Sequence, residues 1–149
     1  MSVKPQKTLF TESLSITIQD LTPNSGSIVI AWEKTKVSIP FTVDTHKAAV
    51  ENIKMAIEKG ENLEKVYANA ASYYRDAKDD LKTAMKYVNK SIEVKPYHGN
   101  LFLKARILKE QGEDKEAINV AEKALEYAIK AENKGYEDYI KGTIKKWSK

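Results

Sequence analysis

Two hydrophobic periods divide the chain into a strand-like part and a helix-like part. Up to about residue 43, apolar and polar positions alternate, as in Leu14, Ile16 and Ile18. From residue 44 onward, apolar positions recur every three or four residues. Alternation is typical of strands, and the longer period is typical of amphipathic helices. The sequence therefore predicts an α+β fold, with a β-meander at residues 1–43 and a helical domain at residues 44–149.

The first part predicts a three-stranded antiparallel meander. The expected strands cover residues 12–19, 28–32 and 36–43. Pro23-Asn24-Ser25-Gly26 is a turn cluster, because Pro presets the turn entry while Asn and Gly tolerate positive φ. Glu33-Lys34-Thr35 is taken as a second, shorter reversal. Pro40 has no amide hydrogen to donate, so its strand is expected at an edge or beside a bulge.

The second part predicts about six helices, each marked by a capping or turn residue. The expected starts are Asp44 or Thr45, Asn62, Asp79, about Gly99, Asp114 and a point shortly before Tyr136. Gly60, Pro96 and Gly112 mark the ends of the first, third and fourth helices. Short connections between the helices predict antiparallel neighbours.

Small residues recur in the middle helices at a fixed spacing. The positions Ala84, Val88 and Ser91 are followed 33 residues later by Ala117, Ala121 and Ala124. The preceding helices match less cleanly. At that spacing Ser72 meets Ala105 and Arg75 meets Leu108, whereas a shift of one residue pairs Ala71 with Ala105. Either alignment predicts an internal repeat of helical hairpins.

The repeat resembles the tetratricopeptide repeat. The matching positions in its second copy are Leu101, Ala105, Leu108, Gly112, Ala117, Ala121 and Ala124, with Ile129 in place of the usual Pro. The first copy spans residues 68–96 and ends at Pro96. Its turn, residues 76–79, departs from the pattern, because it is about one residue too long and lacks the usual Gly. The final helix is similar to a capping helix.

The resemblance implies a protein–protein interaction module with no catalytic role. In tetratricopeptide arrays, the first helix of each hairpin lines a concave groove for a peptide. The positions that match in this sequence are Asn69, Tyr73, Phe102, Arg106 and Lys109. Asn and Tyr can hydrogen-bond a peptide backbone, and Arg and Lys can pair with its carboxylates. The open alternative is that these side chains only pack against neighbouring hairpins or face solvent.

A wider resemblance covers most of the chain. The stretch SGSIVIAWEKTKVSIPFTVDT followed by tetratricopeptide-like hairpins is similar to the last part of a bacterial domain-of-unknown-function family. That family has a larger β-domain ahead of the helices and is exported, which implies a periplasmic or secreted location. On this resemblance the chain is a fragment. The alternative function is then a structural accessory domain that stabilises an absent N-terminal β-domain.

Charge and composition argue against several functional classes. The 25 basic and 21 acidic residues give a net charge of +4, and most of the charges are interleaved. Nucleic-acid binding is not expected, because there are only two arginines and no one-signed basic stripe. No apolar run approaches the roughly 20 residues that a membrane-spanning helix needs.

Catalytic and metal-binding signals are also missing from the sequence. Cys is absent, and His46 and His98 stand far apart with no further ligand at metal-binding spacing. The six glycines form no phosphate-binding cluster. We therefore expect no enzyme activity, no cofactor and no metal.

The first predicted strand suggests self-association. Residues 12–19 contain neither Pro nor Lys, and their LSITI core is strongly β-prone. An uncovered strand edge is a template for another strand. The sequence therefore predicts a possible homodimer in which two copies pair through residues 12–19.

Overall fold

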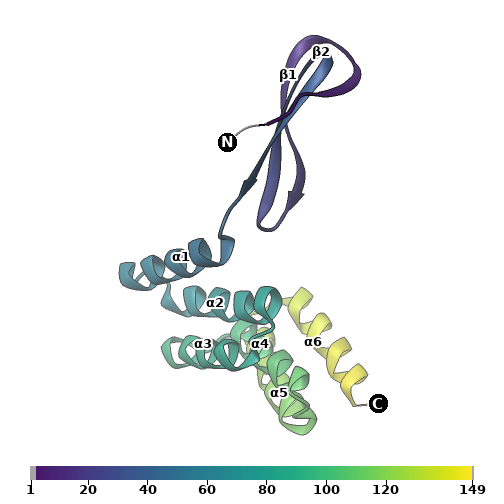
Figure 1. Cartoon of the computed structure of the whole chain (residues 1–149). Coiled ribbons are helices and arrows are strands. Elements are labelled where there is room, and N and C mark those ends of the chain that lie inside the picture. Colours follow the sequence, from purple (N-terminus) through teal and green to yellow (C-terminus); the bar gives the residue numbers. More distant parts are fainter. Residues whose placement is uncertain (1–2, 149) are drawn as a thin grey trace. The chain divides into compact units, whose positions relative to one another are not determined.

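A computed structural model describes residues 3–148 of the chain (Figure 1). The contacts divide it into two compact units, one ending at Asn52 and the other beginning at Ile53. The first unit contains the β-hairpin and the start of the first helix. The second contains the remaining helices.

The hairpin consists of two long antiparallel strands, β1 (Gln6–Thr22) and β2 (Ser25–Thr42). The predicted three-stranded meander is therefore wrong, because its second and third strands are one continuous strand. Glu33-Lys34-Thr35 has no Gly or Asn to form a tight hairpin turn. Instead Glu33 takes a positive φ of 50°, and the register shifts at its pairing with Thr11. Beyond this irregularity Gln6 pairs with Lys36, so β1 begins earlier than expected.

The end of β2 returns to the turn of the same hairpin. The Val43 N–H donates to the Asn24 carbonyl at 2.8 Å, and the Thr45 hydroxyl donates to the Asn24 side-chain oxygen at 2.5 Å. The Phe41 ring lies so close to Gly26 that an added Cβ would sit 2.6 Å from it. Gly26 therefore permits the hairpin to curl back on itself.

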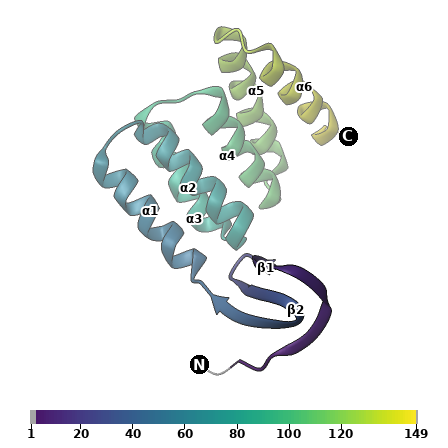
Figure 2. The same cartoon turned by 90° about the horizontal axis from the view of Figure 1, so that it is seen from above.

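Within residues 3–148 the chain forms six helices: α1 (Thr45–Lys59), α2 (Leu63–Lys78), α3 (Leu81–Val94), α4 (His98–Glu110), α5 (Asp114–Lys130) and α6 (Lys134–Trp147). Helices α2 and α3 form one hairpin, and α4 and α5 form the next. Helix α3 packs on α4, and α6 packs on α5 (Figure 2). The prediction of about six helices after a β-segment is confirmed.

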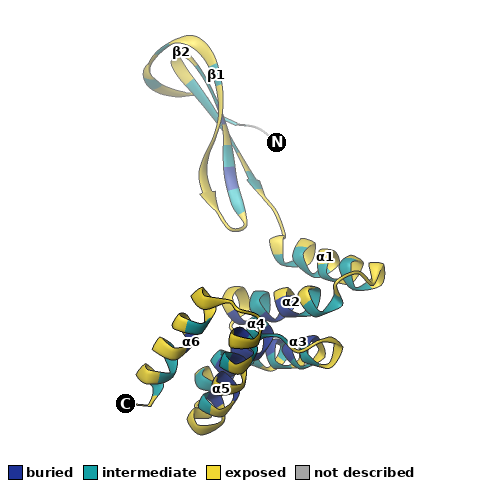
Figure 3. Cartoon of the chain, turned by 180° about the vertical axis from the view of Figure 1, so that it is seen from behind, coloured by how far each residue is buried: buried dark blue, intermediate teal, exposed yellow. Residues whose placement is uncertain are grey.

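Fully buried alanines form much of the helical core. Ala71 and Ala84 lie in the cluster of the first hairpin, and Ala105, Ala117 and Ala121 lie in the cluster of the second. Small side chains let two helices approach closely. In Figure 3 most buried residues of the helical unit lie on α2, α3, α4 and α5. Ala71 and Ala105 hold matching places, each facing the second helix of its own hairpin, which favours the one-residue shift.

The turns of the two helical hairpins have different sequences, but each contains one residue in the left-handed backbone conformation. Asp79 follows α2 with φ 52°, and Gly112 follows α4 with φ 83°. Asp79 was expected to open the next helix, but it ends α2, and the Asp80 carboxylate caps α3 by accepting the Thr83 N–H at 2.9 Å. Asp79 in the first repeat and Gly112 in the second therefore hold the same left-handed position. The first repeat has one more residue between Ala71 and this position than the second has after Ala105, and that additional residue lies within α2.

Within residues 3–148, no helix is both long enough and apolar enough to cross a bilayer.

Candidate functional site

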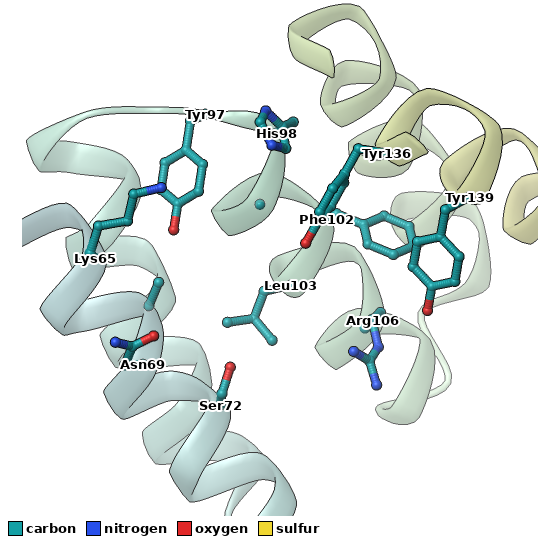
Figure 4. A pocket seen from close by; sticks show the side chains of 12 residues that line it. Lys65, Asn69, Ser72, Tyr97, His98, Phe102, Leu103, Arg106, Tyr136 and Tyr139 are labelled. Atoms are coloured by element: carbon teal, nitrogen blue, oxygen red, sulfur yellow. The ribbon is translucent and has the colours of Figure 1, made fainter. Parts of the chain in front are cut away.

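A hollow with a volume of about 400 Å³ opens between α2, α4 and α6 (Figure 4). Its lining residues are Lys65, Ala68, Asn69, Ser72, Tyr97, His98, Gly99, Phe102, Leu103, Arg106, Tyr136 and Tyr139. Helices α2 and α4 are the first helices of their hairpins, and α6 follows the second hairpin. One face of the helical array therefore contributes all of the lining residues.

Helix α2 supplies a polar side to the hollow. Lys65, Asn69 and Ser72 are spaced four and three residues apart, which places them on one helix face. Figure 4 shows the Lys65 side chain against the Tyr97 ring, and its ammonium lies 3.5 Å from the ring centroid. Asn69 is exposed, so its side-chain amide can reach a ligand. Helix α2 thus offers hydrogen-bonding groups rather than apolar surface.

A buried network fixes the start of α4 at the rim of the hollow. The Tyr97 N–H donates to the Asn100 side-chain oxygen at 2.9 Å. The Asn100 amide donates to the Ser91 hydroxyl and to the Lys95 carbonyl, each at 2.9 Å. The Ser91 hydroxyl in turn donates to the carbonyl of Glu64 on α2 at 2.5 Å. Because Asn100 is fully buried, these bonds hold the preceding aromatic residues in place.

Aromatic side chains form the opposite wall. The rings of His98 and Tyr136 lie 4.6 Å apart, and Phe102 meets Tyr139 edge-on at 5.4 Å. Trp147 stacks on the Phe102 ring, with the two ring centroids 6.2 Å apart. Tyr136 is 37% exposed and Tyr139 is 56% exposed. This wall therefore presents ring surface that a partner can cover.

Burial shifts the titration of two groups in the hollow. Desolvation lowers the pKa of His98 below its ordinary value of 6.5, and the nearby Lys65 ammonium lowers it further. Desolvation also raises the pKa of Tyr97, with Tyr136 and Glu64 adding smaller effects. Both shifts favour uncharged side chains at neutral pH. His98 is therefore a neutral member of the aromatic wall rather than a cation.

Arg106 carries the charge at the centre of this face. It lines the hollow and also a second one of about 350 Å³, to which α6 contributes Lys146 and Trp147. Among residues 3–148 its guanidinium makes no salt bridge. The nearest acid on its helix, Glu110, is engaged by Arg75 at 3.5 Å. Arg106 thus has its charge available to a ligand.

The structure brings some of the five predicted residues together and separates others. Asn69, Phe102 and Arg106 line the hollow, although Phe102 is only 3% exposed and forms its floor. Lys109 lines the second hollow and pairs with Asp114 at 2.8 Å. Tyr73 lies outside the lining of the first hollow and contacts the Tyr74 ring. Their role in peptide binding stays a prediction.

The sequence reasoning missed most of the aromatic wall. Tyr97 and His98 lie at the start of α4, and the sequence assigned neither of them to a binding surface. Tyr136 and Tyr139 lie on α6, which was interpreted only as a capping helix. The clustering of aromatic residues in the helical half was the signal available for them. Assigning them to one wall requires the packing of α6 against α5.

The arrangement is suited to binding and lacks the usual components of a metal site. Within the described part of the chain, no three His, Asp or Glu side chains cluster closely enough to hold a metal ion. The polar groups of the hollow are donors and amphipathic rings. This set can hydrogen-bond an extended backbone, cover apolar side chains and pair with a carboxylate.

Comparison with known proteins addresses the helical unit alone. Residues 64–98 and 99–128 each match the family model described as tetratricopeptide repeat. Neither the curated proteins nor the solved structures gave a significant match. Nothing in these comparisons supports the wider resemblance to a bacterial family of unknown function. The matched segments coincide with the α2–α3 and α4–α5 hairpins, so these two hairpins are similar to tetratricopeptide repeats.

Proposed function

We propose that the helical unit is a non-catalytic protein–protein interaction module that binds an extended acidic peptide in the hollow between α2, α4 and α6. The tetratricopeptide repeats indicate protein partners as a class. The chemistry of the hollow suggests which kind of peptide fits. The observation that carries this proposal is Arg106, a cation without an ion pair among residues 3–148, placed where two hollows meet.

The charges around Arg106 favour an acidic ligand. Lys65 lines one hollow and Lys146 the other, so cations accompany Arg106 along the face. The one carboxylate lining these hollows belongs to Glu110, which Arg75 engages. An acidic segment would therefore meet net positive charge. Asn69 would hydrogen-bond its backbone, and Tyr136 and Tyr139 would cover its apolar side chains.

Peptide arrays test this proposal directly. Eight-residue peptides containing Asp or Glu next to aliphatic residues would be compared with peptides in which Asn or Gln replaces each acid. We expect the parent protein to prefer the acidic set, with a preference that weakens as salt increases. Equal binding of the acidic and amide sets would overturn the proposed chemistry.

Two charge-reversal variants locate the binding face. Arg106→Glu should lower the affinity for the acidic peptides by about tenfold or more, because a charge-assisted hydrogen bond is worth roughly 1.5–3 kcal/mol. Lys86→Glu makes the same charge change on the exposed surface of α3 and should leave the affinity nearly unchanged. Equal losses in both variants would show that only the overall charge matters.

The alternative function is an accessory domain that stabilises another β-domain. No observation favours it over peptide binding. It predicts that the isolated chain binds no acidic peptide, so the array experiment separates the two functions.

A further inference from the structure

The hairpin exposes its more apolar face. Ile16 pairs with Ile30 and Ile18 with Ile28, so these four side chains share one face, and Trp32 follows in alternation. Ile16, Ile18 and Trp32 are 67%, 62% and 57% exposed. The other side carries the polar residues Thr17, Gln19 and Ser27, and Val29 pairs with Thr17 there.

The two faces of the hairpin are covered to different extents. Val29, on the opposite face, is only 4% exposed. The curl of β2 brings Phe41 against Gly26, which by alternation lies on the same side of β2 as Ile28 and Ile30. Phe41 therefore covers the isoleucine side next to the turn, and Ile28 is only 37% exposed, whereas Ile16, Ile18 and Trp32 stay mostly exposed.

We propose that two copies of the chain pack their isoleucine faces together, where the isoleucine face is Ile16, Ile18, Ile28, Ile30 and Trp32. Between Ser13 and Gln19 and between Leu21 and Trp32 the sequence contains no charged residue. The face thus offers no charge by which a different partner would be selected. Isoleucine surface is complementary to itself, and a two-fold axis matches the same patch on both copies.

The exposed surface is large enough for such a contact. Burying a side chain of this size removes roughly 100 Å² of apolar surface from water. Five side chains from each copy therefore bury about 1,000 Å² in total, which reaches the lower limit of a specific interface. A two-stranded sheet is also only marginally stable alone, so packing a second sheet on it stabilises both. This proposal replaces pairing through the strand edge at residues 12–19, because side chains rather than backbone carry the exposed apolar surface.

Molecular mass and Trp32 fluorescence test the dimer together. The Trp147→Phe variant leaves Trp32 as its single tryptophan. Light scattering should show a monomer that becomes a dimer across the micromolar to millimolar range. Trp32 emission should shift to the blue over the same range. A monomer at every concentration overturns the proposal, as does a dimer that leaves Trp32 emission unchanged.

Matched lysine variants assign the interface to one face of β1. Ile18→Lys should remain monomeric, and Gln19→Lys, which places the same charge on the opposite face of the same strand, should dimerise like the parent. Ile28→Thr keeps a β-branched residue and should weaken association by at least about tenfold without breaking the strand. Unchanged association in both Ile18→Lys and Ile28→Thr overturns the proposal. Neither outcome bears on peptide binding by the helices.

Discussion

Two glycines with open space around them should respond oppositely to an added methyl group. A Cβ at Gly112 or at Gly142 would meet nothing within 4 Å. Gly112, however, has φ 83°, whereas Gly142 lies inside α6 without a positive φ. The left-handed conformation costs an L-residue roughly 1–2 kcal/mol, and Ala is favoured over Gly within a helix by about 1 kcal/mol.

Gly112→Ala should therefore lower the free energy of unfolding by about 1 kcal/mol, and Gly142→Ala should raise it by about 1 kcal/mol. Urea unfolding followed by far-ultraviolet circular dichroism measures both values. Changes of the same sign would contradict the assigned backbone conformations.

Protonation of His98 should destabilise the helical unit. Burial and Lys65 lower its pKa in the folded state, so the unfolded chain binds its proton more tightly. The stability contributed by neutral His98 is present above its ordinary pKa and is lost as the pH falls through the folded-state value. Relative to His98→Gln, the parent should lose stability between about pH 8 and pH 5. Because both proteins keep His46, parallel stability curves would contradict this role of His98.

At the scale of elements, the Asn100 network joins the two repeats. It ties Glu64 on α2, Ser91 on α3 and the start of α4 through one buried amide. Asn100→Ala leaves several buried polar groups without partners and should lower the free energy of unfolding by about 3 kcal/mol. Asn119→Ala removes an exposed amide on α5 and should change it by less than about 0.5 kcal/mol. Equal losses in the two variants would show that the network contributes nothing specific.

The elements differ in how far the sequence predicted them. The helices were predictable because apolar spacing and local capping residues mark each one, as Gly112 does after α4. The continuous β2 was not predictable, because Glu33 adopts a left-handed conformation at an irregularity in the strand pairing. Glu is not a residue type that favours this conformation. The extended β1 was missed for the same reason, since Gln6 finds its partner only across that irregularity.

In the candidate site, too, the residues placed by local sequence patterns were predictable, and those placed by contacts between distant segments were not. Asn69 and Arg106 were predictable because the repeat pattern places them on the first helix of each hairpin. The position of Tyr97 depends on Asn100 and its partners in other helices, and that of Tyr139 depends on how α6 packs. Such contacts between distant segments leave no periodic signal in a single sequence.

The whole molecule carries two surfaces with different chemistry. The helical unit offers hydrogen-bond donors, aromatic rings and Arg106, a cation without an ion pair among residues 3–148, and these groups suit an acidic peptide. The hairpin offers the uncharged isoleucine face, which suits a second copy. Disrupting one surface should therefore leave the other active, so Ile18→Lys should keep the parent's affinity for acidic peptides. Loss of peptide binding in this variant would show that the two surfaces are coupled.

Nuclear magnetic resonance mapping of a bound acidic peptide shows whether the ligand occupies the hollow between α2, α4 and α6. Titration into the labelled protein should shift the backbone amides of Asn69, Tyr97, Arg106 and Tyr139, which line the hollow on three different helices. Residues away from the hollow, such as Lys123 on α5, should not move. Perturbations confined to α3 and α5, or no perturbation by any peptide that binds, would contradict the assignment of this face.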